Sequence, residues 1–523
     1  MQEATMSSDA QKQRKMRWWI PLLLMVAGGG HVVTLFVGED TNRQFISVGL
    51  ALVLGFVALP LWYILLTQQP ASRVGRLLGG WGLSLVFLVG ALLFTTRWEG
   101  SLSGGAVPRL GWRWAQKPDE KLHELTGSGG EPVRQAKNLY LDFPQFLGPK
   151  RNGVLEISLD PDWETHPPEE LWRREIGAGW SGFSVVNFRA VTQEQRGGKE
   201  LVSCYDLVTG EPLWVVEEEV RFKEVMGGDG PRANPAIVKG RVYALGATGI
   251  LNCIDLVSGQ RIWRRSVLEE RGSENLLYGK ASSPLVEGEL VIVTGGKKPG
   301  PTLLAYDRMG GEPVWAAGKD SASYASPVVM ELDGCRQVVC VNHNTVTGHE
   351  IVSGKILWTW NWPATRPKSA QAQQVGPEEI LVTASYGMGA AVLQVTQEAD
   401  GFKARASWKK KVMKTKFSNV CLKDGYAYGL SEARLACVSL VSGERLWRGD
   451  YYGYGQNLLV GDHLLVQAEP GHVSLLQVNR DGFRELGRLE ALSDTTWNNP
   501  SLAGEYLLLR NDRQAVCYRL RLK

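Results

Sequence analysis

The chain has 523 residues, of which 58 are Lys or Arg and 54 are Asp or Glu, and its formal net charge is +4. This length allows more than one domain and a large core, and so small a charge excess gives no indication of a nucleic-acid partner. The seven cysteines form no C-x-x-C pair, which argues against the common zinc, thioredoxin-type and c-haem motifs.

Three apolar stretches at the start of the chain predict a membrane anchor. Residues 18–38, 44–72 and 77–96 contain no Asp, Glu, Lys or Arg, and each can cross about 30 Å of hydrocarbon as a helix. We therefore expect three transmembrane helices, at about 18–38, 45–66 and 77–96. A cleaved signal peptide is the alternative for the first stretch, but no small-residue cleavage site follows it.

Basic residues indicate the orientation of this anchor. Four of them precede the first stretch, and two lie between the second and the third. The positive-inside rule then places residues 1–17 in the cytoplasm and everything after Thr96 outside. We predict a protein of the cytoplasmic (inner) membrane whose C-terminal part faces the periplasm or exterior. Residues 97–140, rich in Gly, Ser, Pro and charge, indicate a linker.

From about residue 170 onward, short alternating apolar runs separated by turn residues are typical of β-structure. One phrase recurs there, Asp-x-x-[Ser/Thr]-Gly followed by a Trp four residues later. An Asp side chain can accept hydrogen bonds from turn amides, and Gly supplies the positive φ that reverses the chain. We expect the repeated residues to be structural, with each Trp packing against the next unit. They are Asp206, Gly210, Trp214, Asp255, Gly259, Trp263, Asp307, Gly311, Trp315, Trp358 and Trp447.

The spacing of the repeats predicts a β-propeller. Successive tryptophans at the end of the phrase lie 39 to 52 residues apart, and about four strands per unit of that length form a propeller blade. Counting gives eight blades, at about 181–218, 233–267, 282–318, 325–361, 369–411, 417–451, 456–492 and 498–523. The last has three strands, and the strand 170–177 completes it, so that no edge stays open. Seven blades is the alternative, because the fifth unit is degenerate.

These repeats resemble the PQQ-like (quinoprotein-type) β-propeller repeat family, which carries A-x-D-x-x-T-G-x-x-x-W. The similarity covers about 170–523, two thirds of the chain. The lead-in "DFPQFLGPKRNGV" (142–154) also resembles that of uncharacterised bacterial extracytoplasmic members, with Phe143 in place of their usual Trp. The expected fold class is therefore all-β, an eight-bladed PQQ-like β-propeller over 141–523 preceded by an α-helical membrane anchor.

The resemblance implies two different activities. Quinoprotein alcohol and glucose dehydrogenases bind PQQ and Ca²⁺ on the propeller axis, whereas an outer-membrane assembly lipoprotein with eight blades has no cofactor and binds a protein. This chain lacks the adjacent cysteines of the dehydrogenases, a haem motif, a matching Asp base and a set of calcium ligands. We therefore favour a non-catalytic binding or assembly scaffold and assign no catalytic residue, metal or cofactor. The alternative is a PQQ-dependent oxidoreductase, with Ca²⁺, acting on alcohols or sugars.

Residues just before each inner strand are expected at the mouth of the central channel. An aromatic ring of such residues, with one Arg, could stack a flat ligand or grip a peptide; packing between blades is the other interpretation. The candidate ligand-binding residues are Trp180, Arg232, Tyr324, Phe417, Tyr454 and Trp497. The expected partners are the membrane and a protein, glycan or small ligand at the propeller face.

Overall fold

The computed structural model describes residues 82, 85, 89–101, 108–132, 142–297 and 300–523. The predicted spans at 18–38 and 45–66 lie outside these residues, as does half of the span at 77–96. Among the residues just given, no helix is both long enough and apolar enough to cross a membrane. The chain divides into two compact units, 1–101 with 106–117, and 102–105 with 118–523.

The described part of the first unit is a helical stretch followed by a β-hairpin. Residues 89–95 are helical, and β1 (Thr96–Ser101) pairs antiparallel with β2 (Pro108–Trp112). The second unit begins with the short helix α5 (Pro118–Lys121). The sequence predicted to be a linker therefore contains local secondary structure.

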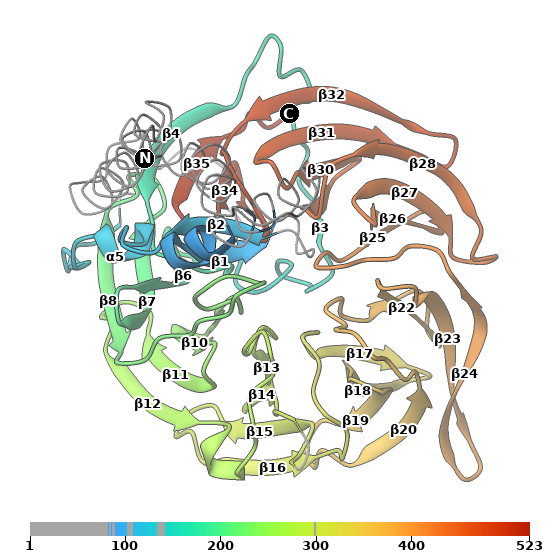
Figure 1. Cartoon of the computed structure of the whole chain (residues 1–523). Helices are drawn as coiled ribbons and strands as arrows, with labels where there is room; N and C mark the ends of the chain where they lie inside the picture. Colours follow the sequence, from blue (N-terminus) through green and yellow to red (C-terminus); the bar gives the residue numbers. More distant parts are fainter. Residues whose placement is uncertain (1–81, 83–84, 86–88, 102–107, 133–141, 298–299) are drawn as a thin grey trace, which may run out of the picture. The chain divides into compact units, whose positions relative to one another are not determined.

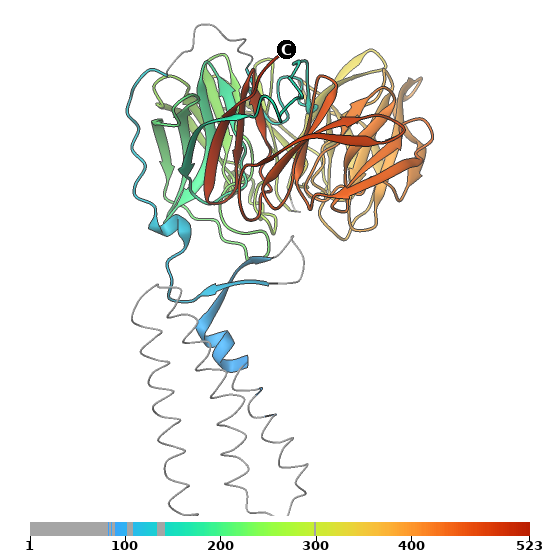
Figure 2. The same cartoon turned by 90° about the horizontal axis from the view of Figure 1, so that it is seen from above.

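The second unit is an eight-bladed propeller, as Figure 1 shows face-on and Figure 2 from the rim. Each blade is an antiparallel sheet of four strands in which the first strand lies nearest the axis, and in blade seven a fifth strand, β3 (Val154–Leu155), is added beside that inner strand. The eight-blade prediction is confirmed and the seven-blade alternative is wrong. The degenerate fifth unit still forms four strands, two of them unusually long.

The strands of blades one to four, in chain order, have the following bounds. They are β5 (Ser184–Val186), β6 (Arg189–Arg196), β7 (Lys199–Asp206), β8 (Pro212–Glu218), β9 (Ala236–Val238), β10 (Arg241–Leu245), β11 (Ile250–Asp255), β12 (Arg261–Ser266), β13 (Leu285–Glu287), β14 (Leu290–Thr294), β15 (Leu303–Asp307), β16 (Pro313–Ala317), β17 (Val328–Leu332), β18 (Cys335–Val341), β19 (Thr345–Glu350) and β20 (Ile356–Asn361). A 3-10 helix, Glu269–Arg271, follows β12.

The strands of blades five to eight continue the same pattern. They are β21 (Gln373–Gln374), β22 (Glu379–Ala384), β23 (Gly389–Glu398), β24 (Gly401–Lys410), β25 (Cys421–Lys423), β26 (Tyr426–Ser431), β27 (Arg434–Ser439), β28 (Arg445–Tyr451), β29 (Gln456–Val460), β30 (His463–Gln467), β31 (His472–Val478), β32 (Phe483–Glu490), β33 (Ser501–Ala503), β34 (Tyr506–Arg510) and β35 (Gln514–Arg519).

The eighth blade joins the two ends of the propeller sequence. Its outer strand is β4 (Glu169–Glu175), which pairs antiparallel with β35 and sets Trp172 opposite Cys517. This pairing closes the ring, and it does so with the strand expected at 170–177. Closure removes the open edge that a three-stranded blade would leave.

The repeated phrase forms the turn between the third and fourth strands of a blade. In blade one, Oδ1 of Asp206 accepts hydrogen bonds from the amides of Val208 and Thr209, both at 2.7 Å. Gly210 follows with a φ of 73°, in the left-handed region that favours glycine. The Asp255 and Asp307 turns repeat these bonds. The phrase is therefore a rigid hairpin turn.

The tryptophan that ends the phrase links neighbouring blades. Nε1 of Trp214 donates to the carbonyl of Leu256 in the next blade at 2.9 Å, and its ring lies so close to Gly259 that a Cβ there would be 2.6 Å away. Five further tryptophans donate to a carbonyl of the following blade, namely Trp172, Trp263, Trp315, Trp408 and Trp447. Trp358 differs and donates to Gln337 of its own blade, because the next blade lacks the repeated turn.

Residues 142–157, which we call the axial plug, run across the centre of the propeller. Phe143 forms an antiparallel bridge with Val185 of blade one, and β3 (Val154–Leu155) pairs parallel with β29 of blade seven. The plug turns back on itself at Leu147 and Arg151, which have φ values of 60° and 50°. The central channel is therefore filled by backbone and side chains of the lead-in.

Candidate functional site

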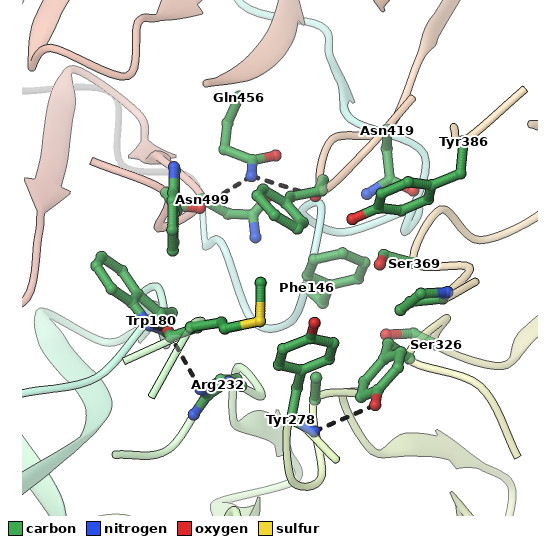
Figure 3. A pocket seen from close by; sticks show the side chains of 17 residues that line it. Phe146, Trp180, Arg232, Tyr278, Ser326, Ser369, Tyr386, Asn419, Gln456 and Asn499 are labelled. Atoms are coloured by element: carbon green, nitrogen blue, oxygen red, sulfur yellow. Dashed lines mark hydrogen bonds between the residues drawn. The ribbon is translucent and has the colours of Figure 1, made fainter. Parts of the chain in front are cut away.

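A pocket of about 140 Å³ lies where the chain enters the inner strands. Its residues come from the loops that precede those strands, and Phe146 of the axial plug lies in their midst (Figure 3). The blades are antiparallel, so these loops and the repeated turns sit at opposite ends of the strands. The pocket therefore opens on the face of the propeller away from the repeated turns.

The structure brings five of the six candidate residues to this one pocket. Trp180, Arg232, Tyr324, Phe417 and Trp497 all line it. Tyr454 lies just behind, because its ring meets that of Phe417 with the centroids 6.0 Å apart. Five of the candidate residues therefore share one lining, and the sixth contacts it.

Hydrogen bonds between neighbouring blades explain why residues at a fixed distance in sequence before each inner strand lie at the pocket. The amide of Asn234 donates to Oγ of Ser283, and the amide of Ser283 donates to Oγ of Ser326, at 2.9 Å each. These residues occupy equivalent places in consecutive blades, and a pocket residue stands two positions before each. The series runs Trp180, Arg232, Ala281, Tyr324, Ser369, Phe417, Tyr454 and Trp497.

Sequence reasoning missed several residues of the lining. Ala281 stands at the same offset from Pro284 and could have been found, but its small side chain did not stand out. Ser369 has no proline after it to mark the register. Tyr278 and Tyr386 lie on loops outside the repeat, and Phe146 comes from the lead-in. No periodic signal in the sequence marks these last three positions.

The aromatic wall of the pocket is held in fixed orientations. The ring centroids of Trp180 and Trp497 are 4.7 Å apart, and those of Phe417 and Trp497 are 5.1 Å apart. Nε1 of Trp497 donates to Glu469 at 2.8 Å, and Nε1 of Trp180 donates to the carbonyl of Gly227 at 2.6 Å. Because both indole N–H groups are satisfied elsewhere, the wall presents apolar ring faces.

Arg232 is the cation of the lining, and the protein backbone holds it in place. Its guanidinium donates to the carbonyls of Gly227, Gly228 and Gly230 at 3.2, 2.6 and 2.5 Å. It also lies 4.9 Å from the centroid of the Phe222 ring. Burial lowers the pKa of Arg232 to about 10, so the group stays charged at neutral pH.

A second cation, Lys416, stands behind the aromatic wall. Its Nζ lies 4.1 Å from the ring centroid of Tyr454, 5.1 Å from that of Phe417 and 5.8 Å from that of Tyr386. Burial lowers the pKa of the Lys416 ammonium, and the charge of Glu469 acts in the opposite direction. The three rings provide the cation–π contacts that partly replace its lost hydration.

The lining does not have the donor set of a quinone-and-calcium centre. Its aromatic faces could stack a flat ring, but none of its residues is an Asp or Glu, so it supplies neither a carboxylate ligand for Ca²⁺ nor a carboxylate base. All seven cysteines are free thiols, and no two are adjacent. Among the described residues no cluster of three His, Cys, Asp or Glu side chains could hold a metal ion.

Comparison with known proteins gives one family and two informative structures. The family model described as "Outer membrane protein assembly factor BamB" matches residues 198–449. BamB from Moraxella catarrhalis is similar at a TM-score of 0.50 and 16% identity, over 67% of this chain and 99% of that one. Quinohemoprotein alcohol dehydrogenase from Comamonas testosteroni is similar at 0.56 and 12% identity, over 72% and 80%. No curated protein matches the chain.

Proposed function

We propose that this chain, whose residues 198–449 match the family model described as an outer membrane protein assembly factor, is a binding or assembly scaffold of the PQQ-like β-propeller type that recognises its partner at the axial pocket. One observation carries the proposal: every blade places one residue of a single register at or directly behind a pocket whose rear is closed by the axial plug. All eight blades therefore contribute to the pocket, rather than a single loop.

The choice of a scaffold over an oxidoreductase rests on the chemistry of the lining. Oxidation of an alcohol needs a base for the hydroxyl proton and a cation to polarise the quinone. The pocket offers rings, neutral amides, hydroxyls and one engaged guanidinium, which are groups that bind and orient a ligand. The family description as an assembly factor agrees with this preference, whereas the dehydrogenase likeness supports the fold alone.

The cellular placement is part of the same proposal. Three apolar stretches precede the propeller in the sequence, and the positive-inside rule directs the propeller outward. The scaffold would then work at the outer surface of the cytoplasmic membrane, in the periplasm or exterior. A topology reporter fused after Lys523 should give an extracytoplasmic signal. A cytoplasmic signal would contradict the three-span anchor.

The decisive experiment compares partner capture with quinone chemistry. The full chain carries a photo-crosslinking residue either at Tyr386, on the pocket, or at Val441, an 88% exposed residue of a repeated turn on the other face. We expect crosslinks to one defined partner from position 386 only. In parallel, the full chain receives PQQ and Ca²⁺ with alcohols or sugars and a reducible dye. Saturable PQQ binding with turnover would contradict the scaffold proposal and support the oxidoreductase.

A further inference from the structure

Two amides on neighbouring blades present a fixed pair of polar atoms to the pocket. Oδ1 of Asn419 accepts the amide of Gln371 at 2.9 Å, which leaves its Nδ2 free to donate. Nε2 of Gln456 donates to the carbonyls of Phe417 and Trp497 at 3.3 and 2.9 Å, which leaves its Oε1 free to accept. The backbone partners fix which end of each amide faces the pocket, so one donor and one acceptor stand ready there (Figure 3).

Further polar side chains of the lining have no hydrogen-bond partner among the described residues, and three of them carry the argument. They are the amide of Asn499 and the hydroxyls of Ser369 and Tyr386. Burial raises the pKa of Tyr386 to about 12, so its hydroxyl keeps its proton at neutral pH. All of these groups are neutral, and each amide or hydroxyl can both donate and accept.

The charges around the pocket are already engaged. Both terminal nitrogens of Arg232 donate to backbone carbonyls, and the Lys416 ammonium lies among three rings with the Glu469 charge nearby. The carboxylates of Glu224 and Asp229 act on Arg232 as Glu469 acts on Lys416, so a negatively charged ligand would meet negative charge beside each cation. The free atoms therefore favour a ligand that is uncharged and carries several hydroxyl groups.

The shape of the lining matches that chemistry. Trp180, Trp497 and Phe417 form an apolar wall, and the amides and hydroxyls belong to the same lining, with Tyr386 and Ser369 across the pocket from Trp180 (Figure 3). A volume of about 140 Å³ is room for roughly ten water-sized groups, which is the scale of one pyranose. A pyranose has C–H faces that pack on aromatic rings and hydroxyls around its edge.

We propose that the axial pocket binds the ring of a neutral saccharide. The sugar ring stacks on the aromatic wall, and its hydroxyl groups are held by Asn419, Gln456, Asn499 and Tyr386. This inference rests on the proposed function, because it names the class of ligand for the same pocket. It assigns recognition and not chemistry, since the lining contains no carboxylate. The ligand enters and leaves by one face, because the axial plug closes the other.

The test uses the full chain in a detergent that carries no sugar headgroup. An array of neutral and anionic oligosaccharides is the first probe, and calorimetry with the best neutral oligosaccharide is the second. Asn499→Ala and Tyr386→Phe remove groups with no partner among the described residues, so both variants should fold. Each should weaken binding about tenfold, the equivalent of one hydrogen bond. Val441→Ser, on the opposite face, is the matched control and should bind like the wild type.

Two kinds of result would overturn the saccharide assignment. One is that no neutral oligosaccharide binds, whether or not anionic ones do. The other is that neutral binding is the same in Asn499→Ala and Tyr386→Phe as in the wild type. A protein crosslinked from position 386 in either case would leave the scaffold standing without the saccharide. PQQ turnover would instead contradict the scaffold proposal, so failure of the saccharide assignment can be distinguished from failure of the proposed function.

Discussion

At the scale of the residue, one close contact recurs around the ring, in which a glycine of the repeated turn lies against a tryptophan ring of the preceding blade. The sequence predicted the turn and the packing of Trp214, because the phrase recurs in order. It could not predict that the indole N–H would reach the carbonyl of Leu256, since that contact depends on the angle between two blades. Position 259 requires glycine for two reasons, the positive φ of the turn and the close contact with the indole ring of Trp214.

Replacing Gly259 with alanine separates the cost of its positive φ from the cost of its contact with the Trp214 ring. Gly259 and Gly240 have φ values of 71° and 75°, so alanine at either position costs about 1–2 kcal/mol in backbone strain. An alanine Cβ would meet the Trp214 ring at 2.6 Å in the first case and nothing within 4 Å in the second. We expect Gly259→Ala to lose a further 1–3 kcal/mol or so of unfolding free energy, measured by urea denaturation. Equal losses in both variants would contradict a tight ring contact.

Lys280 is a lysine whose side chain is fully buried in the propeller. Its ammonium is fully buried and donates to the carbonyl and the hydroxyl of Thr294, at 2.7 Å each, and to the carbonyl of Gly295. A sequence reading places lysine on the surface. Burial lowers the pKa of Lys280 to about 7, whereas an unfolded lysine has a pKa of about 10.4.

This shift predicts a pH dependence of stability. Between about pH 7 and 10 the folded chain binds fewer protons at Lys280 than the unfolded chain, so its contribution to stability rises with pH. The cost of burying the charge is fully present below pH 7. We expect Lys280→Met to flatten the plot of unfolding free energy against pH over this range, measured by denaturant titrations at several pH values. Lys297→Met, at an exposed lysine, should keep the slope of the wild type.

At the scale of the element, the axial plug connects the blades. Arg151 is 3% exposed, and its guanidinium donates to the carbonyls of Ser283 and Pro284 before blade three and of Pro327 before blade four. In blade five, Nε2 of Gln371 donates to the carbonyl of Arg151, and the plug also pairs with blades one and seven. One short segment thus ties together blades that are far apart in the sequence.

Replacing Arg151 should loosen this connection. Arg151→Met leaves several buried carbonyls without a donor, and we expect a loss of at least about 2 kcal/mol together with faster hydrogen exchange over 142–157. Lys150→Met is the matched control. Its exposed pair with Glu156 is worth less than about 1 kcal/mol, so stability and exchange should stay near the wild type. Unchanged exchange in Arg151→Met would show that other contacts hold the plug.

The blades could be predicted from the sequence and the plug could not, for one physical reason. A blade is a local object, since its strands are neighbours in the chain and its turns repeat. The hydrogen bonds of Arg151 to blades three, four and five join residues 132 to 220 positions apart, and no period marks such partners. The site divides in the same way: Arg232 and Tyr324 follow the blade register, whereas Phe146 and Tyr386 do not.

At the scale of the whole molecule, a buried ionic network joins blade eight to blade one. The Glu194 carboxylate is fully buried and accepts from Arg196 at 2.9 Å and from the amide of Gly177 at 2.6 Å. Burial opposes its ionisation, but the charges of Arg196 and Arg510 hold the pKa of Glu194 below its usual value. Arg510 itself donates to the carbonyls of Gln193 and Gly177, which spans the closure of the ring.

Neutralising this carboxylate tests how much the closure depends on it. Glu194→Gln leaves the buried Arg510 and the partly buried Arg196 without their counter-charge, and we expect a loss of about 3 kcal/mol in unfolding free energy. Glu170→Gln breaks a part-exposed pair with Arg173 in the same closing strand and should cost less than about 1 kcal/mol. Comparable losses in the two variants would place the strength of the closure in β4 and not in the network.

The closing strand and the axial plug both precede the blades in the chain, and this sets an order of assembly. During synthesis, residues 142–175 emerge before any blade exists to receive them. β4 has no neighbour until β35 has been made, more than 300 residues later. Native contacts of such long sequence separation make folding slow. The nascent chain must therefore keep β4 unpaired until nearly the whole ring has been translated, whereas the axial plug gains its contacts step by step, from blade one to blade seven.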